Sequence, residues 1–239
     1  MTYFLHETRY RDLSPALGRQ VTICGAGALG ANLTETLARM GLRKLRVIDR
    51  DRVEPHNLST QPWAQQDVGV PKVRALAMAL YRAVSARVEP QHIELTPENA
   101  AQLLAGSTVV VDAFDNLPSR MAVAAACRQL GLHCLHIGLG DGGDYGCGLW
   151  DDQYRTCVFQ EPRTEESTAD HRQPTTGRTQ PRLAASSGLS VLDACDYPLT
   201  RPLALLVAAA GAETLICHML DGSRRGFDLT LRDLRLTPL

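Results

Sequence analysis

The stretch that decides the fold is VTICGAGALG, residues Val21–Gly30. Four mostly apolar residues lead into glycines at 25, 27 and 30, and a helical pattern begins directly afterwards. Glycines at this spacing allow a tight turn, let backbone N–H groups come close to a phosphate, and place the start of the next helix against it. Gly25, Gly27 and Gly30 therefore predict a nucleotide-binding turn, a feature that most often serves nicotinamide or flavin dinucleotides.

Strand and helix patterns alternate along the first two thirds of the chain. Buried strands are expected at Val21–Cys24, Leu45–Asp49, Val88–Leu95, Thr108–Asp112 and His133–Ile137. Helices are expected at Ala28–Met40, Lys72–Ser85, Asn99–Leu104 and Pro118–Leu130. This alternation predicts an α/β fold with a Rossmann-like, doubly wound and mainly parallel sheet, whose ligands bind at the carboxyl ends of the strands.

The last third of the chain has a different pattern. The glycine-rich stretch Gly138–Gly143 either lets an extended chain pass close to the backbone or forms a plain turn. Gly148–Trp150 and Thr156–Phe159 suggest a hairpin, and the polar residues 161–190 suggest a mobile loop. A buried helix at Leu199–Leu220 and antiparallel strands near Phe227–Leu231 and Leu234–Leu236 complete what we expect to be a single domain over residues 1–239.

Composition restricts the classes of function. A chain of 239 residues with 44% hydrophobic residues can bury a full core. The formal net charge of -1 and the 5% aromatic content argue against nucleic-acid binding. We find no signal peptide and no uninterrupted apolar stretch of about 20 residues, the length that spans a bilayer. Seven cysteines without a disulfide framework are typical of a reducing compartment, so we expect a cytoplasmic protein.

Two residues downstream of the glycine turn could contact a bound nucleotide, and only the second of them points away from a dehydrogenase. Asp49 ends the second strand, where a carboxylate accepts hydrogen bonds from ribose hydroxyls, although it could also be a surface acid. Lys72 begins a helix, from which a long cation can reach nucleotide phosphates and offset the charge on departing pyrophosphate. A single lysine is more often solvated, but a dehydrogenase has no evident use for one here.

The pair Asp115–Asn116 follows the strand Thr108–Asp112 at its carboxyl end. A carboxylate at this position can hold Mg²⁺, which prefers oxygen ligands and bridges phosphates. The alternative is an Asx turn before Pro118.

Taken together, these residues resemble the ThiF/MoeB/HesA family of adenylyltransferases, which have the fold of ubiquitin-activating enzymes. The resemblance covers most of the chain and rests on GAGALG, the acid of VIDRD, NLSTQ, GVPK and DAFDN. It implies an ATP site that includes Asn57, Gln61, Lys72, Asp115 and its neighbour Asn116, with Asp115 as the magnesium ligand.

The resemblance also implies a function. It implies ATP- and Mg²⁺-dependent adenylation of the C-terminal carboxylate of a small ubiquitin-like or sulfur-carrier protein by a homodimer, with a conjugating enzyme as a further partner. Cys195 lies where thioester-forming members carry their cysteine, a role that needs an accessible thiolate. Asp193 and Asp196 would raise the pKa of that thiol, and the alternative is a small buried hydrophobe.

The chain departs from the family pattern in three places. Thr60 stands where members usually have an arginine that contacts the triphosphate, and Ala28 replaces a common glycine. No CxxC pair occurs, although Cys157 lies where one would be, so we expect no structural zinc site. Arginines that could replace the one missing at position 60 are Arg50, Arg52 and Arg74, or Arg9 and Arg11 from a second subunit.

Two histidines and three other functions remain to be weighed. His133 and His136 lie on an expected buried strand, so we expect satisfied core residues rather than ligands. Thr60 would suit a scaffold subunit that is catalytically weak or inactive and completes a partner's site. Only the glycine turn and Asp49 support an NAD(P) dehydrogenase. Activation of a carboxylate on a tRNA base or a peptide is a further possibility within the family.

Overall fold

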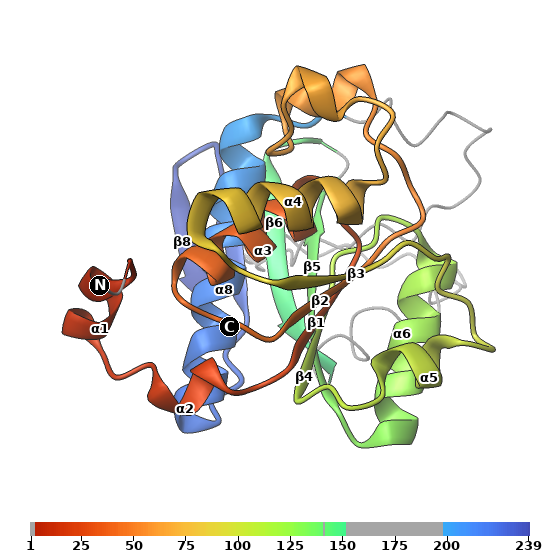
Figure 1. Ribbon diagram of the computed structural model, residues 1–239. Helices are drawn as coiled ribbons and strands as arrows, with labels where there is room; N and C mark the ends of the chain where they lie inside the picture. The colour runs from red at the N-terminus through yellow and green to blue at the C-terminus, as the bar shows by residue number, and fades with distance from the viewer. Residues whose placement is uncertain (1–2, 141, 152–197) are drawn as a thin grey trace, which may run out of the picture.

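The computed structural model describes residues 3–140, 142–151 and 198–239 (Figure 1). A single eight-stranded sheet runs through these residues, in the order β3-β2-β1-β4-β5-β6-β7-β8. The first five of these strands are parallel: β3 (Val88–Gln91), β2 (Leu45–Ile48), β1 (Val21–Cys24), β4 (Val109–Asp112) and β5 (His133–Leu139). The last three are antiparallel: β6 (Tyr145–Trp150), β7 (Phe227–Thr230) and β8 (Arg235–Pro238). The expected mainly parallel sheet with antiparallel C-terminal strands is confirmed.

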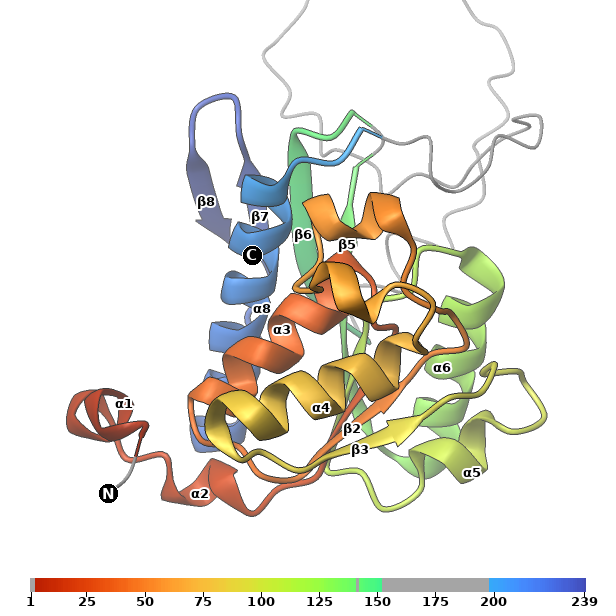
Figure 2. The ribbon, with the colours of Figure 1, turned by 45° about the horizontal axis from the view of Figure 1, so that its top comes forward.

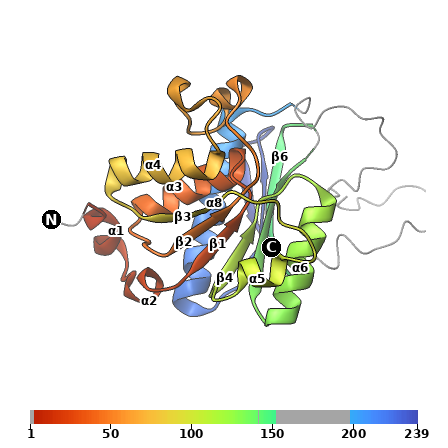
Figure 3. The same ribbon diagram turned by 45° about the vertical axis from the view of Figure 1, so that its right-hand side comes forward.

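Helices cover both faces of the sheet (Figure 3). One face carries α3 (Ala28–Arg39), α4 (Lys72–Val84) and α8 (Arg201–Asp221), and the other carries α5 (Ala100–Leu104) and α6 (Leu117–Leu130). Two short 3₁₀ helices, η1 (Pro55–Ser59) and η2 (Gln65–Asp67), lie between β2 and α4. The core accordingly has two parts, a larger one beneath α3, α4 and α8 and a smaller one beneath α5 and α6.

The predicted length of one strand is wrong, and two helices were not predicted. β3 ends at Gln91 rather than Leu95, because it lies at the sheet edge with Pro90 inside it and Leu95 packs into the smaller core instead. The short helices α1 (Leu5–Tyr10) and α2 (Ser14–Leu17) begin the chain. Helix α1 buries none of its residues, so it lacks the apolar stripe that predicts a helix.

By length and composition alone, helix α8 is long and apolar enough to cross a membrane, although Glu213 interrupts its apolar run. More than half (56%) of its most apolar window is buried within the fold, as in the core helix of a globular domain. Its Gly211 allows close packing, since a Cβ there would lie 3.1 Å from Leu33 Cδ1 on α3.

Part of the expected C-terminal organisation can be placed. Gly148–Trp150 belongs to β6, whose partners are β5 and β7, and Gly140 N–H donates to the carbonyl of Tyr145 in the connection between β5 and β6. The other half of the expected hairpin, Thr156–Phe159, lies outside the described residues. So do the polar segment 161–190, Cys157 and Cys195.

Candidate functional site

The candidate site lies where three neighbouring parallel strands end. In the sheet Cys24 of β1 is paired with Ile48 of β2 on one side and with Asp112 of β4 on the other. Gly25 N–H donates to the Ile48 carbonyl at 2.8 Å, and Ala113 N–H donates to the Cys24 carbonyl at 2.9 Å. The glycine turn, the acid after β2 and the loop after β4 therefore meet at one edge of the sheet, as expected for such a fold.

The three glycines of the turn are not all needed for the same physical reason. Gly25 has φ +101°, and a Cβ there would lie 3.0 Å from the Ala113 carbonyl oxygen. A Cβ on Gly30 would lie 1.9 Å from the Gly25 carbonyl oxygen. Gly27 precedes α3, and no atom lies within 4 Å of the place of its Cβ. The first and third glycines are thus required by packing, while the second leaves open space over the positive end of α3, where a phosphate could lie.

A pair of alanine substitutions separates these roles. Gly30→Ala is expected to lower the free energy of unfolding by about 2–3 kcal/mol, because backbone must move to admit the methyl group. Gly27→Ala, at φ -81°, is expected to cost less than about 1 kcal/mol but to weaken Mg-ATP binding. Urea unfolding and calorimetric titration measure the two effects. Equal stability losses in the two variants would contradict this assignment.

The carboxylate of Asp49 fixes the glycine turn by hydrogen bonding. Its Oδ2 accepts a hydrogen bond from Ala26 N–H at 2.6 Å, and its Oδ1 accepts one from Asp51 N–H at 2.7 Å. Burial raises the pKa of this carboxyl, and the two backbone hydrogen bonds oppose that rise in part. The surface-acid alternative is therefore wrong, and the ribose contact remains a prediction.

Lys72 is buried, with 8% of its surface exposed. Its Nζ lies 3.1 Å from Asp51 Oδ2, and its backbone N–H donates to the Asp51 carbonyl. It is the first residue of α4, as expected. The alternative of a freely solvated lysine is wrong, because this amine is fixed at the end of β2.

Asn57 and Gln61 are both buried in the loop around η1. Asn57 Oδ1 accepts a hydrogen bond from Glu54 N–H at 2.9 Å, and Gln61 Oε1 accepts one from Trp63 Nε1 at 2.7 Å. Within the described ranges neither side-chain nitrogen has a hydrogen-bond partner, so each amide can donate to a ligand. Asn32, which the sequence analysis missed, ties this loop to α3 by donating to the carbonyls of Ala28 and Thr60.

The loop after β4 carries Asp115 and Asn116, both exposed. Asn116 Oδ1 caps α6 by accepting a hydrogen bond from Ser119 N–H at 3.0 Å. Asn116 therefore has a structural role as a helix cap, and this bond to the third residue on is not the expected Asx turn, because Pro118 has no N–H to donate. Asp115 is exposed, and its Oδ1 accepts a hydrogen bond from Asn116 Nδ2 at 3.5 Å. A carboxylate in this position can hold a divalent cation, which takes oxygen ligands.

A network of ion pairs around the buried His136 is connected to this loop, and it was not predicted. His136 Nδ1 lies 2.8 Å from Asp112 Oδ2, and its Nε2 lies 3.2 Å from Asp151 Oδ1. Arg120 of α6 lies 3.6 Å from the same Asp112 oxygen. Asp112 Oδ1 in turn accepts a hydrogen bond from Phe114 N–H, so the network holds the turn that leads to Asp115. The expectation of a satisfied core residue fits His136, whereas His133 is exposed.

The same place offers three metal-ligating groups. The ligand atoms of Cys134, His136 and Asp151 all lie within 4.8 Å of one another. Burial raises the pKa of the Cys134 thiol well above its ordinary value, which opposes the thiolate that a metal requires. The absence of a structural zinc site therefore remains a prediction.

Replacement of His136 by glutamine should give a pH-dependent loss of stability. Burial lowers the pKa of His136, but its hydrogen bonds to Asp112 and Asp151 outweigh burial and raise that pKa above 6.5. The stabilisation is therefore complete below about pH 6.5 and is lost as the pH rises through the folded-state pKa. We expect a loss of about 3 kcal/mol at pH 6 and a smaller loss at pH 9.

Asp112 keeps its charge at both of these pH values. Burial raises the pKa of its carboxyl, but Arg120 and His136 lower it below its ordinary value. Urea unfolding at the two pH values measures the difference, with the exposed His133→Gln on the same strand as the control. A loss that is equal at pH 6 and pH 9 would contradict a charged His136.

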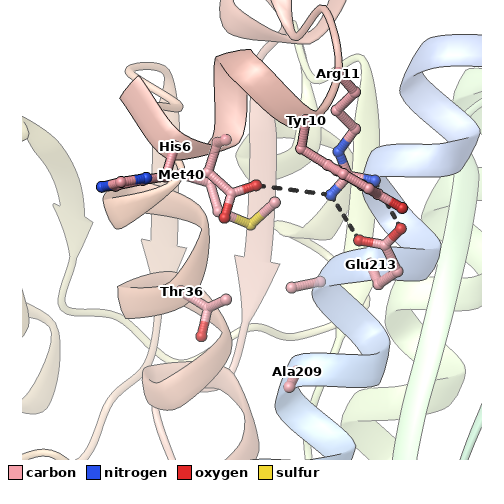
Figure 4. A pocket seen from close by; sticks show the side chains of 9 residues that line it. His6, Tyr10, Arg11, Thr36, Met40, Ala209 and Glu213 are labelled. Carbon is pink, nitrogen blue, oxygen red and sulfur yellow. Dashed lines mark hydrogen bonds and ion pairs between the residues drawn. The ribbon is translucent and has the colours of Figure 1, made fainter. Parts of the chain in front are cut away.

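A cavity of about 350 Å³ lies away from this site, among α1, α3 and α8 (Figure 4). Across it Arg11 forms two hydrogen bonds of 2.6 Å with the carboxylate of Glu213 on α8. Arg11, which could have served a second subunit, is thus engaged within its own chain. The cavity is lined by His6, Glu7, Tyr10, Arg11, Thr36, Met40, Ala209, Ala212 and Glu213.

Curated relatives are similar to about half of this chain. The SAMP-activating enzyme E1 of Haloferax volcanii is 39% identical over 123 residues, which are 50% of this chain and 45% of the relative. The sulfur carrier protein adenylyltransferase of Thermus thermophilus is 39% identical over 114 residues, 46% of this chain and 42% of the relative. The chain thus matches less than half the length of these relatives.

Solved structures share the fold. The tRNA N6-threonylcarbamoyladenosine dehydratase TcdA of E. coli is 27% identical, with a TM-score of 0.55 over 59% of this chain and 61% of that one. E. coli MccB superposes with a TM-score of 0.71 over 95% of this chain and 65% of its own, at 15% identity, which shows the fold alone. The ThiF family model matches residues 4–218. A match over that much of the sequence means that the chain belongs to the ThiF family.

Proposed function

We propose that this chain adenylates the C-terminal carboxylate of a small ubiquitin-like or sulfur-carrier protein, with ATP and Mg²⁺. The observation that carries the proposal is the meeting at one sheet edge of the open turn at Gly27, the buried amine of Lys72 and the exposed carboxylate of Asp115. The names of the relatives from Haloferax volcanii and Thermus thermophilus support the same reaction class.

In the proposed reaction a carboxylate oxygen of the carrier forms a bond to the α-phosphorus of ATP, and the bond to the departing pyrophosphate breaks. The N-terminal amides of α3 and the ammonium of Lys72 stabilise negative charge on the phosphates. Lys72 needs little reorganisation, because Asp51 already holds it in place. Asp115 would hold Mg²⁺, which offsets phosphate charge when bound.

We extend the proposal to a second step on Cys195. There the thiolate would attack the acyl carbonyl, form a thioester and release AMP. This step rests on the resemblance to the family, in which thioester-forming members carry their cysteine at the place of Cys195.

A second candidate is a catalytically weak or inactive scaffold subunit of a heteromeric complex. Thr60 favours it, since this buried side chain carries no charge toward a triphosphate. The buried Lys72 and the exposed Asp115 favour the enzyme, because a scaffold needs neither.

The proposal also covers the compartment, the oligomeric state and the partners of the protein. We propose a cytoplasmic homodimer that meets a carrier protein and a conjugating enzyme and binds neither membrane nor nucleic acid. Residues 1–239 would form one adenylation domain.

Calorimetry with Mg-ATP and with NAD tests the proposal first. Binding of ATP without binding of NAD, followed by pyrophosphate exchange when a cognate carrier is present, is the expected result. Binding of the carrier without exchange would favour the scaffold, and binding of NAD alone would favour a dehydrogenase.

A further inference from the structure

Arg201, the first residue of α8, reaches across the molecule to the loop around η1. Its Nη1 donates to the carbonyl of Gln61 at 3.3 Å and to the carbonyl of Ser59 at 3.4 Å. These two carbonyls flank Thr60, some 140 residues earlier in the chain. Figure 2 shows the start of α8 beside this loop, close to the end at which α3 begins.

The loop that Arg201 contacts is itself fixed to the anion-binding end of α3. Asn32 Nδ2 donates to the Thr60 carbonyl at 2.9 Å and to the carbonyl of Ala28, the first residue of α3, at 2.6 Å. The guanidinium of Arg201 is therefore held, through one short loop, beside the first turn of the helix on which the phosphates would lie.

Arg201 differs from Lys72 and Arg50 in the partners of its charged group. Lys72 is paired with Asp51, and Arg50 is paired with Glu94. Arg201 has only main-chain carbonyl partners among the described residues, so no carboxylate there cancels its charge. Those contacts use Nη1, which leaves the N–H groups of Nη2 and Nε for another acceptor.

We propose that Arg201 binds the polyphosphate of the nucleotide, a role that rests on the proposed function. Phosphate oxygens match the fork of N–H donors on a guanidinium, and the resulting hydrogen bonds are charge-assisted. Arg201 thus supplies, from the start of α8, the positive charge that the buried Thr60 does not.

Calorimetric binding of Mg-ATP and of AMP tests this role. Arg201→Ala should weaken Mg-ATP binding about 10- to 100-fold, the value of a hydrogen bond to a charged group, and change AMP binding less than twofold. Arg201→Lys, which keeps the charge, should lose less than Arg201→Ala. Adding Thr60→Arg to Arg201→Ala should recover most of the lost affinity, since the new guanidinium starts between the same two carbonyls.

The matched control is Arg43→Ala. Arg43 also donates to a main-chain carbonyl, that of Ser85 at 3.4 Å, but lies beyond the other end of α3, and both affinities should stay unchanged. Unaltered Mg-ATP binding by Arg201→Ala would overturn the inference. Equal losses for Mg-ATP and AMP, or a loss of affinity in Arg52→Ala instead, would overturn it as well. A wild-type protein that binds no Mg-ATP removes the proposed function and the inference with it, and the wild-type titration alone reveals that case.

Discussion

Replacing Lys72 by alanine is expected to lower kcat/KM for ATP–pyrophosphate exchange by about 10²- to 10³-fold, the usual effect of removing one preorganised charge donor. The amine is preorganised because Lys72 is buried, with only 8% of its surface exposed, and because its Nζ donates a hydrogen bond of 3.1 Å to Asp51. Folding should survive, since the side chain of Asp51 is 53% exposed and water can replace its partner.

The chain offers a matched control for this variant, because it has only two lysines. Lys44→Ala removes the other one, an exposed residue just before β2, and should leave exchange unchanged. An acyl-phosphate derivative of ATP, which acylates amines near bound phosphates, should label Lys72 but not Lys44. Exchange within threefold of wild type in Lys72→Ala would exclude this residue from the reaction.

The fold could be predicted from local patterns because each parallel strand and its following helix have a signal of their own. The run Val21–Cys24, the β-branched run ending at Asp112 and the glycines at helix ends each fix a boundary within a few residues. Helix α1 has no such signal, since it is held by Arg11 and Glu213, a contact over 202 positions.

The site could be predicted only in part, because contacts between residues far apart in the sequence leave no local pattern. Residues directly after strands, such as Asp49 and Asp115, were found because topology alone brings strand ends together. The roles of His136 and Arg201 were not found, because they depend on groups that lie far from these residues in the sequence. The carboxyls of Asp112 and Asp151 meet His136 only once β4, β5 and β6 are adjacent. Arg201 likewise meets its two carbonyls only after α8 packs beside α3.

The burial of Lys72 illustrates a third case, in which the sequence predicted the position of a residue but not its environment. The helix start after Pro71 was predicted, yet an isolated lysine is most often solvated. The structure buries it because its backbone pairs with Asp51 and the following Val73 packs into the larger core. Burial of this kind turns a surface cation into a fixed one, which is why its removal is expected to have so large an effect.

The second large effect is expected from Asp115→Asn, which should lower kcat/KM for exchange by about 10²-fold or more and raise the Mg²⁺ concentration needed for half-maximal rate. An amide keeps the shape of the carboxylate but loses the charge that a hard divalent cation requires. Because Asp115 is exposed, the free energy of unfolding should change by less than about 0.5 kcal/mol.

The neighbouring Asn116 makes this result specific to the charge. Asn116→Ala removes the cap of α6 and should cost about 1 kcal/mol of stability, so a helix defect has its own signature in urea unfolding. Asp233→Asn, an exposed acid between β7 and β8, controls for loss of a surface charge. If Asp115→Asn kept both its rate and its Mg²⁺ dependence, Asp115 would not hold the metal.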